Sequence, residues 1–198
     1  MPSRERAPIA LELSGSLLLA GAYAILLPGG AGVALPWPLK VAARVRGSDE
    51  ATLTTRDRQG TVTIALRGGY PDAPAAVTLD FGEAPAQGTS ALAALAWDAW
   101  HRGSPDPASA ARLHRAWQQG VGSGYDVWTS ALGRPLWLET RSDLLSCEPM
   151  TVAASASLVV GVGPKGPSTS ALVSRFLRRA NAHPEAARAL GRASFAAC

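Results

Sequence analysis

Apolar and polar residues alternate along short stretches of the first half of the chain, which is the pattern of strands with one buried face. In the stretch after residue 38, for example, every second residue is apolar (Leu39, Val41, Ala43 and Val45). Two earlier apolar stretches are interrupted by the sequence SGS at 14–16. The predicted strands are 9–13, 16–20, 39–45, 61–67 and 76–81. We expect them to form an antiparallel meander, with a turn and a short apolar element at 21–30.

Helical periodicity follows in the middle of the chain. The Ala- and Leu-rich stretch 88–100 predicts a helix that begins at Gly88, with Thr89 or Ser90 as its N-cap. A second helix is predicted within 104–120, where Pro107 falls near the first turn.

Three more elements complete the prediction. A short helix, 126–133, ends at Gly133, and 151–163 is predicted to be a strand that leads into a loop. The segment 168–190 is predicted to be one amphipathic helix, with an apolar stripe made of Leu172, Val173, Phe176 and Leu177. A group of strands followed by helices indicates an α+β fold.

Composition narrows the classes of partner. The chain has 198 residues, of which 47% are apolar, enough for one domain or for one domain and part of a second. Its net charge of +4 comes from scattered arginines, without the dense basic run or interleaved aromatic residues of a nucleic-acid surface. We therefore expect an anionic small-molecule substrate, and neither a nucleic-acid nor a membrane partner. The two cysteines have no zinc or disulfide-framework spacing, and His114 is expected to be a hydrogen-bonded structural histidine.

The apolar stretch that begins at Ser16 follows Arg4 and Arg6, so a signal peptide is an alternative to a folded segment. Glu12 and the Ser14-Gly15 pair lie between the two arginines and this apolar stretch, which breaks at the Pro28-Gly29-Gly30 turn, too early for a membrane span. We expect the segment to be retained in a cytoplasmic protein.

The stretch GVGSGYDVWTSALG, residues 120–133, places Gly122, Ser123 and Gly124 before a single acid, Asp126. Glycine is costly to order, so a cluster of glycines indicates a sharp turn or a backbone that closely approaches something else. A turn that leads into a helix directs N–H groups and the positive helix end at one spot, which suits phosphate oxygens. Asp126 is then either a catalytic carboxylate beside this spot or simply the cap of the helix.

Several motifs in this order resemble those of the GHMP small-molecule kinases. LSGSLLLAGAYAIL resembles the family opening, P-G-K-hhhh-G-E-Y/H-A-V-L, and PAQGTSALAALAWDAW falls where the family has its P-x-x-x-G-L-G-S-S-A-A phosphate loop. HRAWQQGVGSGYDVWTSALG is similar to A-H-x-x-Q-G-K-V-G-S-G-F-D-V-A-x-A-V-Y-G of the phosphomevalonate kinases. LVVGVGPKGPSTSALVSRFLRRANAHPEAARAL resembles the start of the second half of that family.

The resemblance implies an α+β fold: a GHMP kinase N-terminal domain, similar to ribosomal protein S5 domain 2, at 1–145, and the start of a ferredoxin-like C-terminal domain at 146–198. It implies ATP-dependent phosphoryl transfer to a small alcohol or phosphorylated acceptor in isoprenoid biosynthesis, with ATP and Mg²⁺ as cofactors. Asp126 would be catalytic. The nucleotide phosphates would bind at Gln87, Gly88, Thr89, Ser90 and Ala91, with Ser90 as a candidate metal ligand. The substrate would contact Ser16, Gly122, Ser123, Gly124 and Thr169.

Four positions depart from the family pattern. Ser16 and Gly120 replace lysines, Ala22 replaces a glutamate, and Ala86 replaces the first glycine of the phosphate loop. Arg115 or Arg134 is expected to replace part of the missing positive charge. The later glycine-rich motif of the family has no counterpart in these residues, so we expect either a fragment or a reduced member of the family.

These departures leave two alternatives to an active kinase. One is a catalytically inactive GHMP-like protein that binds a nucleotide or phosphorylated metabolite, or serves as a partner subunit. The other is a secreted binding protein that begins near residue 35. The acceptor and the oligomeric state do not follow from the sequence.

Overall fold

The computed structural model describes residues 6–68, 70, 73–141, 144–152 and 169–198, and these residues divide between two compact units. The first unit contains residues 1–17, 35–120 and 124–134, and the second contains 18–34, 121–123 and 135–198. None of the described helices is long and apolar enough to cross a membrane.

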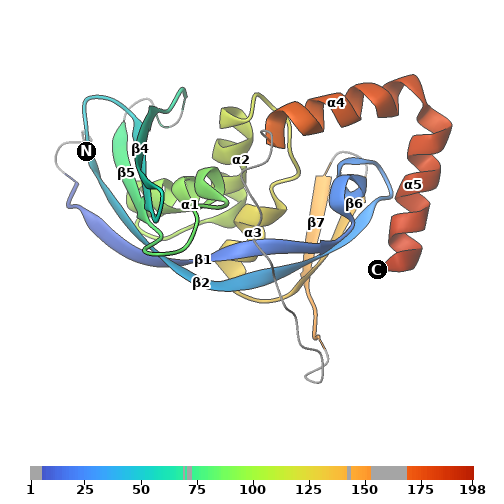
Figure 1. Ribbon diagram of the computed structural model, residues 1–198, viewed down its shortest axis with the longest axis horizontal. Helices are drawn as coiled ribbons and strands as arrows, with labels where there is room; N and C mark the ends of the chain where they lie inside the picture. The colour runs from blue at the N-terminus through green and yellow to red at the C-terminus, as the bar shows by residue number, and fades with distance from the viewer. Residues whose placement is uncertain (1–5, 69, 71–72, 142–143, 153–168) are drawn as a thin grey trace. The chain divides into compact units, whose positions relative to one another are not determined.

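The first unit is built on a mixed sheet (Figure 1). Its strands are β1 (Ile9–Ala20), β2 (Ala31–Gly47), β3 (Thr52–Asp57), β4 (Gly60–Ala65) and β5 (Ala75–Asp80), where β1 and β2 extend into the second unit. The strand order is β4-β3-β5-β2, and β1 also pairs with β2. β2 runs antiparallel to β5, whereas β3 runs parallel to β5. The observed fold is therefore α+β, as predicted.

The sheet differs from the predicted meander in three respects. The segments 9–13 and 16–20 form one continuous strand, β1, because the short polar residues of the SGS sequence do not prevent extended pairing. β3 was not predicted, since Thr, Arg and Asp leave it little apolar alternation. The β3–β5 pair is parallel because the β3–β4 hairpin places β3, not β4, beside β5.

Three helices pack together in this unit: α1 (Thr89–Arg102), α2 (Pro107–Trp117) and α3 (Tyr125–Leu132). α1 packs on β5, and every residue of α1 from Ala91 to Trp100 is buried. Trp97, 1% exposed, donates a hydrogen bond from Nε1 to the Ala73 carbonyl at 3.0 Å. The all-round apolar character of α1 makes it the centre of the core, and only its first two residues, Thr89 and Ser90, are partly exposed before the buried stretch begins.

The second unit contains the short helix η2 (Ala22–Leu26), the first residues of β2, β6 (Leu136–Arg141), β7 (Leu144–Pro149), α4 (Thr169–Ala182) and α5 (Pro184–Ala197). Residues 31–34 of β2 pair antiparallel with β6, and β6 pairs with β7. The strand and turn predicted for 16–26 are present as the end of β1 and η2.

The prediction of a single helix over 168–190 is wrong, because this segment forms two helices, α4 and α5, that are separated at His183-Pro184. Pro184 has no N–H for a continuing helix and disfavours helical geometry at the residue before it. The predicted apolar stripe is confirmed in part, since Val173 is buried and Phe176 stacks on Tyr23 with a centroid distance of 5.2 Å. The strand predicted for 151–163 lies, from residue 153 onward, outside the described residues. The division at 145 and 146 stays a prediction.

Candidate functional site

α1 begins without a side-chain cap. Its N-cap is Gly88, in the left-handed region with φ 61°, and no side chain caps the helix, so the predicted N-cap role of Thr89 or Ser90 is wrong. A Cβ atom at position 88 would meet no heavy atom within 4 Å, which leaves the space beside this turn open. The first N–H groups of a helix have no partner within it, and they lie at the positive end of the helix dipole. The N–H groups of Thr89, Ser90 and Ala91 are in these positions.

Ser90 and Asp126 meet at one imidazole. Ser90 Oγ lies 3.0 Å from Nε2 of His114 on α2, and His114 Nδ1 lies 3.6 Å from Oδ1 of Asp126 on α3. His114 is 2% exposed, whereas the Asp126 side chain is 21% exposed. His114 is thus buried and hydrogen-bonded, as predicted. Two residues predicted from separate motifs, one for phosphate binding and one for catalysis, contact the same side chain.

Asp126 is not the N-cap of α3, because Gly124 has that position with φ 78°. Asp126 lies in the first turn, where the helix dipole favours its charged form, and its Oδ1 accepts a hydrogen bond from the Val127 N–H at 3.0 Å. Burial and, secondarily, the charge of Asp126 raise the pKa of the Tyr125 hydroxyl. A phenol that stays neutral therefore lies next to the Asp126 carboxylate at this end of α3.

The loop before α1 is held by Asp57, a residue that the sequence did not single out. Asp57 Oδ2 accepts a hydrogen bond from the Ala86 N–H at 2.9 Å, and Oδ1 accepts one from the Gln59 N–H at 2.8 Å. These bonds, that from Ala86 above all, lower the pKa of Asp57. The local turn at Asp57 to Gly60 is visible in the sequence, but the bond to Ala86 is not, because the two residues are far apart along the chain.

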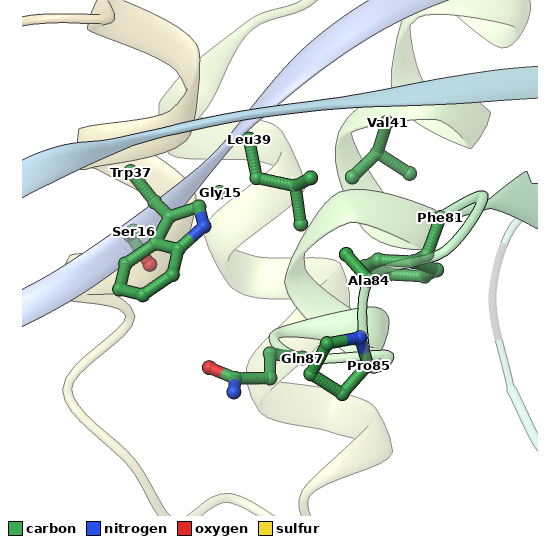
Figure 2. Close-up of a pocket in the computed structure, with 9 residues that line it drawn as sticks. All are labelled: Gly15, Ser16, Trp37, Leu39, Val41, Phe81, Ala84, Pro85 and Gln87. Atoms are coloured by element: carbon green, nitrogen blue, oxygen red, sulfur yellow. The ribbon is translucent and has the colours of Figure 1, made fainter. Parts of the chain in front are cut away.

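A small pocket of about 40 Å³ lies beside the same loop. Figure 2 shows its walls: Trp37, Leu39 and Val41 project from β2, and Phe81, Ala84, Pro85 and Gln87 come from the segment between β5 and α1. Gly15 and Ser16 of β1 complete the lining. Most of this surface is apolar, with polar groups from Ser16 and Gln87. The pocket therefore joins a predicted substrate residue to the first predicted phosphate-binding residue.

The other predicted substrate residues are distributed between the units. Gly124 precedes α3 in the first unit, whereas Gly122 and Ser123 fall in the second. Thr169 is the first residue of α4, also in the second unit. Their role in substrate binding stays a prediction.

Arg115 is the better placed of the two predicted replacement cations. Its Nε donates a hydrogen bond at 3.0 Å to the carbonyl of Gly120, the position where the family motif has lysine. Arg134 is exposed after the end of α3. A guanidinium from α2 is thus held at the glycine-rich segment from within the first unit.

Among the described residues, no three or more His, Cys, Asp or Glu side chains gather as a metal site. The oxygens near His114 are the hydroxyl of Ser90 and the carboxylate of Asp126. Mg²⁺ in phosphoryl-transfer sites commonly takes one or two protein ligands and fills its other positions with phosphate and water. The residues present fit an ion bound in that way, together with a nucleotide.

No protein-family model matches the sequence, and no curated protein matches it significantly. Solved structures do match. Streptococcus pneumoniae phosphomevalonate kinase, in complex with phosphomevalonate and AMPPNP, is 18% identical, with a TM-score of 0.51 over 71% of this chain and 58% of that chain. The fold is that of the GHMP-type kinases.

Two further solved structures also match this chain. Lactococcus lactis galactokinase, complexed with galactose, is 14% identical, with a TM-score of 0.50 over 76% of this chain and 49% of that chain. The Lin0012 protein from Listeria innocua is 14% identical, with a TM-score of 0.61 over 95% of this chain and 70% of that chain. The chain thus spans about half to three fifths of the length of the two kinases. At these identities the likeness establishes the fold alone.

Proposed function

We propose that this chain is an ATP-dependent small-molecule kinase of the GHMP type, with phosphoryl transfer similar to that of phosphomevalonate and mevalonate kinases. The observation that carries the proposal is the convergence of Ser90 and Asp126 on His114. In phosphoryl transfer the protein mainly positions the reactants and stabilises charge. Such a site needs groups that donate hydrogen bonds to the phosphates, next to a group that orients the acceptor hydroxyl. Ser90, at the start of α1, and Asp126 are brought close together in this way by their shared contact with His114.

The nucleotide phosphates bind at Gln87 to Ala91, where the free N–H groups and the dipole of α1 favour anions. The apolar pocket beside Gln87 receives one edge of the base, with the Trp37 ring as a wall. The Ser90 hydroxyl would hold Mg²⁺ together with the nucleotide, and the ion would supply neutralisation of charge on the phosphates. The AMPPNP bound to the phosphomevalonate kinase supports ATP as the donor.

Asp126 orients the acceptor hydroxyl or takes its proton. Gly122, Ser123 and Gly124 let the backbone approach an acceptor, a small alcohol or its phosphate, and Ser16 and Thr169 are further contacts. Arg115, held at Gly120, supplies positive charge in place of the missing lysine. Such a reaction places the protein in the cytoplasm, where ATP is available.

The alternative is a GHMP-like protein that binds a nucleotide or metabolite without catalysis. The observation that favours it is the loss of two lysines and a glutamate, at Ser16, Gly120 and Ala22, together with the absence of an acidic cluster among the described residues. Electrostatic groups of this kind are each worth about 3 kcal/mol of barrier.

Two measurements separate these functions. Calorimetric titration with Mg·ATP tests nucleotide binding, and a phosphotransfer assay with mevalonate, phosphomevalonate and hexose acceptors tests chemistry. Binding with transfer supports the kinase. Binding without transfer to any acceptor supports the inactive alternative. No binding of Mg·ATP contradicts the kinase and the nucleotide-binding form of the alternative, and only a metabolite-binding protein then remains.

A further inference from the structure

One ring nitrogen of His114, Nδ1, is buried but makes no hydrogen bond. The ring is 2% exposed, and its Nδ1 is fully buried without a hydrogen bond. The atom that faces it at 3.6 Å is the carboxylate oxygen Oδ1 of Asp126. A buried polar atom without a partner costs stability, so such an arrangement points to a role beyond packing.

The position of the proton on the ring follows from the two neighbours. A neutral imidazole has one N–H donor and one acceptor nitrogen. If Nδ1 were the acceptor, its lone pair would face the negative oxygen of Asp126, which is repulsive. With the proton on Nδ1, the positive edge of the ring lies 3.6 Å from the carboxylate oxygen, and Nε2 accepts a hydrogen bond from the Ser90 hydroxyl, 3.0 Å away. This second tautomer satisfies both contacts.

The tautomer in turn orients Ser90. When the Ser90 hydroxyl donates its one hydrogen bond to His114, both lone pairs of Oγ remain available as acceptors. Ser90 lies in the first turn of α1, beside the open space at Gly88. An oxygen whose lone pairs are free can bind a cation. To bind an anionic phosphate oxygen, the Ser90 hydroxyl would instead have to donate its hydrogen bond to the phosphate.

We propose that His114 is a positioning residue: its Nε2 accepts a hydrogen bond from the Ser90 hydroxyl, which leaves the lone pairs of that oxygen free to bind the divalent cation of a nucleotide, and its Nδ1–H faces the Asp126 carboxylate. The catalytic consequence rests on the proposed kinase function, but the relay itself, a hydrogen bond to Ser90 and an electrostatic contact with Asp126, does not. One buried side chain thereby couples the cation end of the site, on α1, to the acceptor end, on α3.

Nitrogen NMR of the apo protein tests the relay without any assay of activity. With uniform ¹⁵N labelling, long-range ¹H–¹⁵N spectra at about pH 8, where imidazoles are mostly neutral, identify the tautomer of each histidine. His114→Asn assigns the His114 signals among the three histidines. We expect the Nδ1–H form. An Nε2–H or doubly protonated ring would overturn the relay, whether or not the protein is a kinase.

Two variants of His114 test its contact with Ser90 and its contact with Asp126 separately. His114→Gln keeps a long side chain whose oxygen reaches toward Ser90, and His114→Asn keeps a shorter amide that reaches toward Asp126. Titration with Mn²⁺ in the presence of saturating ADP measures the cation site. We expect His114→Asn to weaken Mn²⁺ affinity by about tenfold and His114→Gln by less than about threefold, with similar melting temperatures for both.

Ser90→Ala is the background that separates positioning from packing. If His114 acts through Ser90, His114→Asn causes no further loss of Mn²⁺ affinity in Ser90→Ala protein. An equal loss in both backgrounds would contradict the proposal. Covalent labelling of Ser90 by a fluorophosphonate would contradict it too, because Ser90 would then be a nucleophile activated by the histidine, as in acyl transfer. Failure of ADP itself to bind would instead contradict the proposed function, and the NMR result would still decide the relay.

Discussion

Asp126 is the residue on which the proposed chemistry depends most. Its carboxylate is partly exposed at the start of α3, whereas the N-cap is Gly124. Asp126→Asn keeps the shape of the side chain and an oxygen that can accept from the Val127 N–H. We expect phosphotransfer to fall by at least about 100-fold with little change in melting temperature. Unchanged transfer would show that Asp126 only stabilises the helix.

Asp57 affects the stability of the loop before α1. Its pKa is lowered by the N–H groups of Ala86 and Gln59, so it binds a proton more weakly in the folded chain than in the unfolded chain. Its contribution to stability is therefore present above about pH 4 and is lost as the pH falls through the lowered pKa. Asp57→Asn should lower the melting temperature by about 2–4 °C at pH 7, with a smaller difference from wild type at pH 3.

Asp80→Asn is the matched control for that measurement. Asp80 accepts a hydrogen bond from the Gly82 N–H at 3.0 Å, within its own turn. A loss as large and as pH-dependent as that of Asp57→Asn would mean that the long-range bond to Ala86 has no special effect.

The role of a single residue could be predicted from the sequence where it depends on residues that are close along the chain. Ser90 and Asp126 were identified because glycine-rich turns before helices are visible in the sequence, and the two do lie at one histidine. The N-cap of α1 was misassigned because glycine in the left-handed region can begin a helix without a side-chain cap. The relay through His114 and the anchor at Asp57 were not predicted, since both join segments that only the folded chain brings together.

At the scale of elements, α5 supports the beginning of β2 within the second unit. The N–H of Ala31, which is fully buried, donates to Ser194 Oγ at 3.1 Å, and that hydroxyl donates to the Gly191 carbonyl at 2.8 Å. A Cβ at Gly191 would lie 3.2 Å from the Pro28 carbonyl oxygen, so α5 approaches the turn after η2 closely. A helix that the sequence merged with α4 is thus a distinct part of this unit.

Ser194→Ala removes the acceptor of the Ala31 N–H and leaves a buried donor unsatisfied. We expect the free energy of unfolding to fall by about 1–3 kcal/mol, measured by denaturant titration. Ala193→Ser, at an exposed neighbouring position on α5, reports the Ala–Ser difference in helix propensity alone. If Ser194→Ala is no more destabilising than that difference, Ser194 does not anchor β2.

Elements with strong local signals were predicted well, and those defined by pairing were not. α1, α2 and α3 follow from periodicity, from Pro107 at the first turn and from Gly133 at the end. The parallel β3–β5 pair does not, because strand order is decided by pairing across the sheet. Val62 and Ile64 alternate like core residues, yet they are 60% and 51% exposed because β4 is the edge strand of its sheet.

At the scale of the whole molecule, the N-terminal segment belongs to the fold. β1 pairs with β2, and η2 packs with β6 and α5 within the second unit. We therefore expect the natively expressed protein to retain these residues. Intact-mass measurement tests this, and a mature N-terminus between residues 28 and 36 would contradict both the retention and the cytoplasmic assignment.

Nucleotide binding at the start of α1 is the central claim, and calorimetric titration with Mg·ADP tests it most directly. Wild-type protein should bind with a dissociation constant of about 1 μM to 1 mM. Gly88→Val strains the left-handed N-cap and fills the open space beside it, and should weaken binding by at least about tenfold. Gly103→Val imposes similar strain at the other end of α1, at φ 89°, and should bind like wild type. Equal affinity in Gly88→Val and wild type, or no binding by wild type, would contradict the claim.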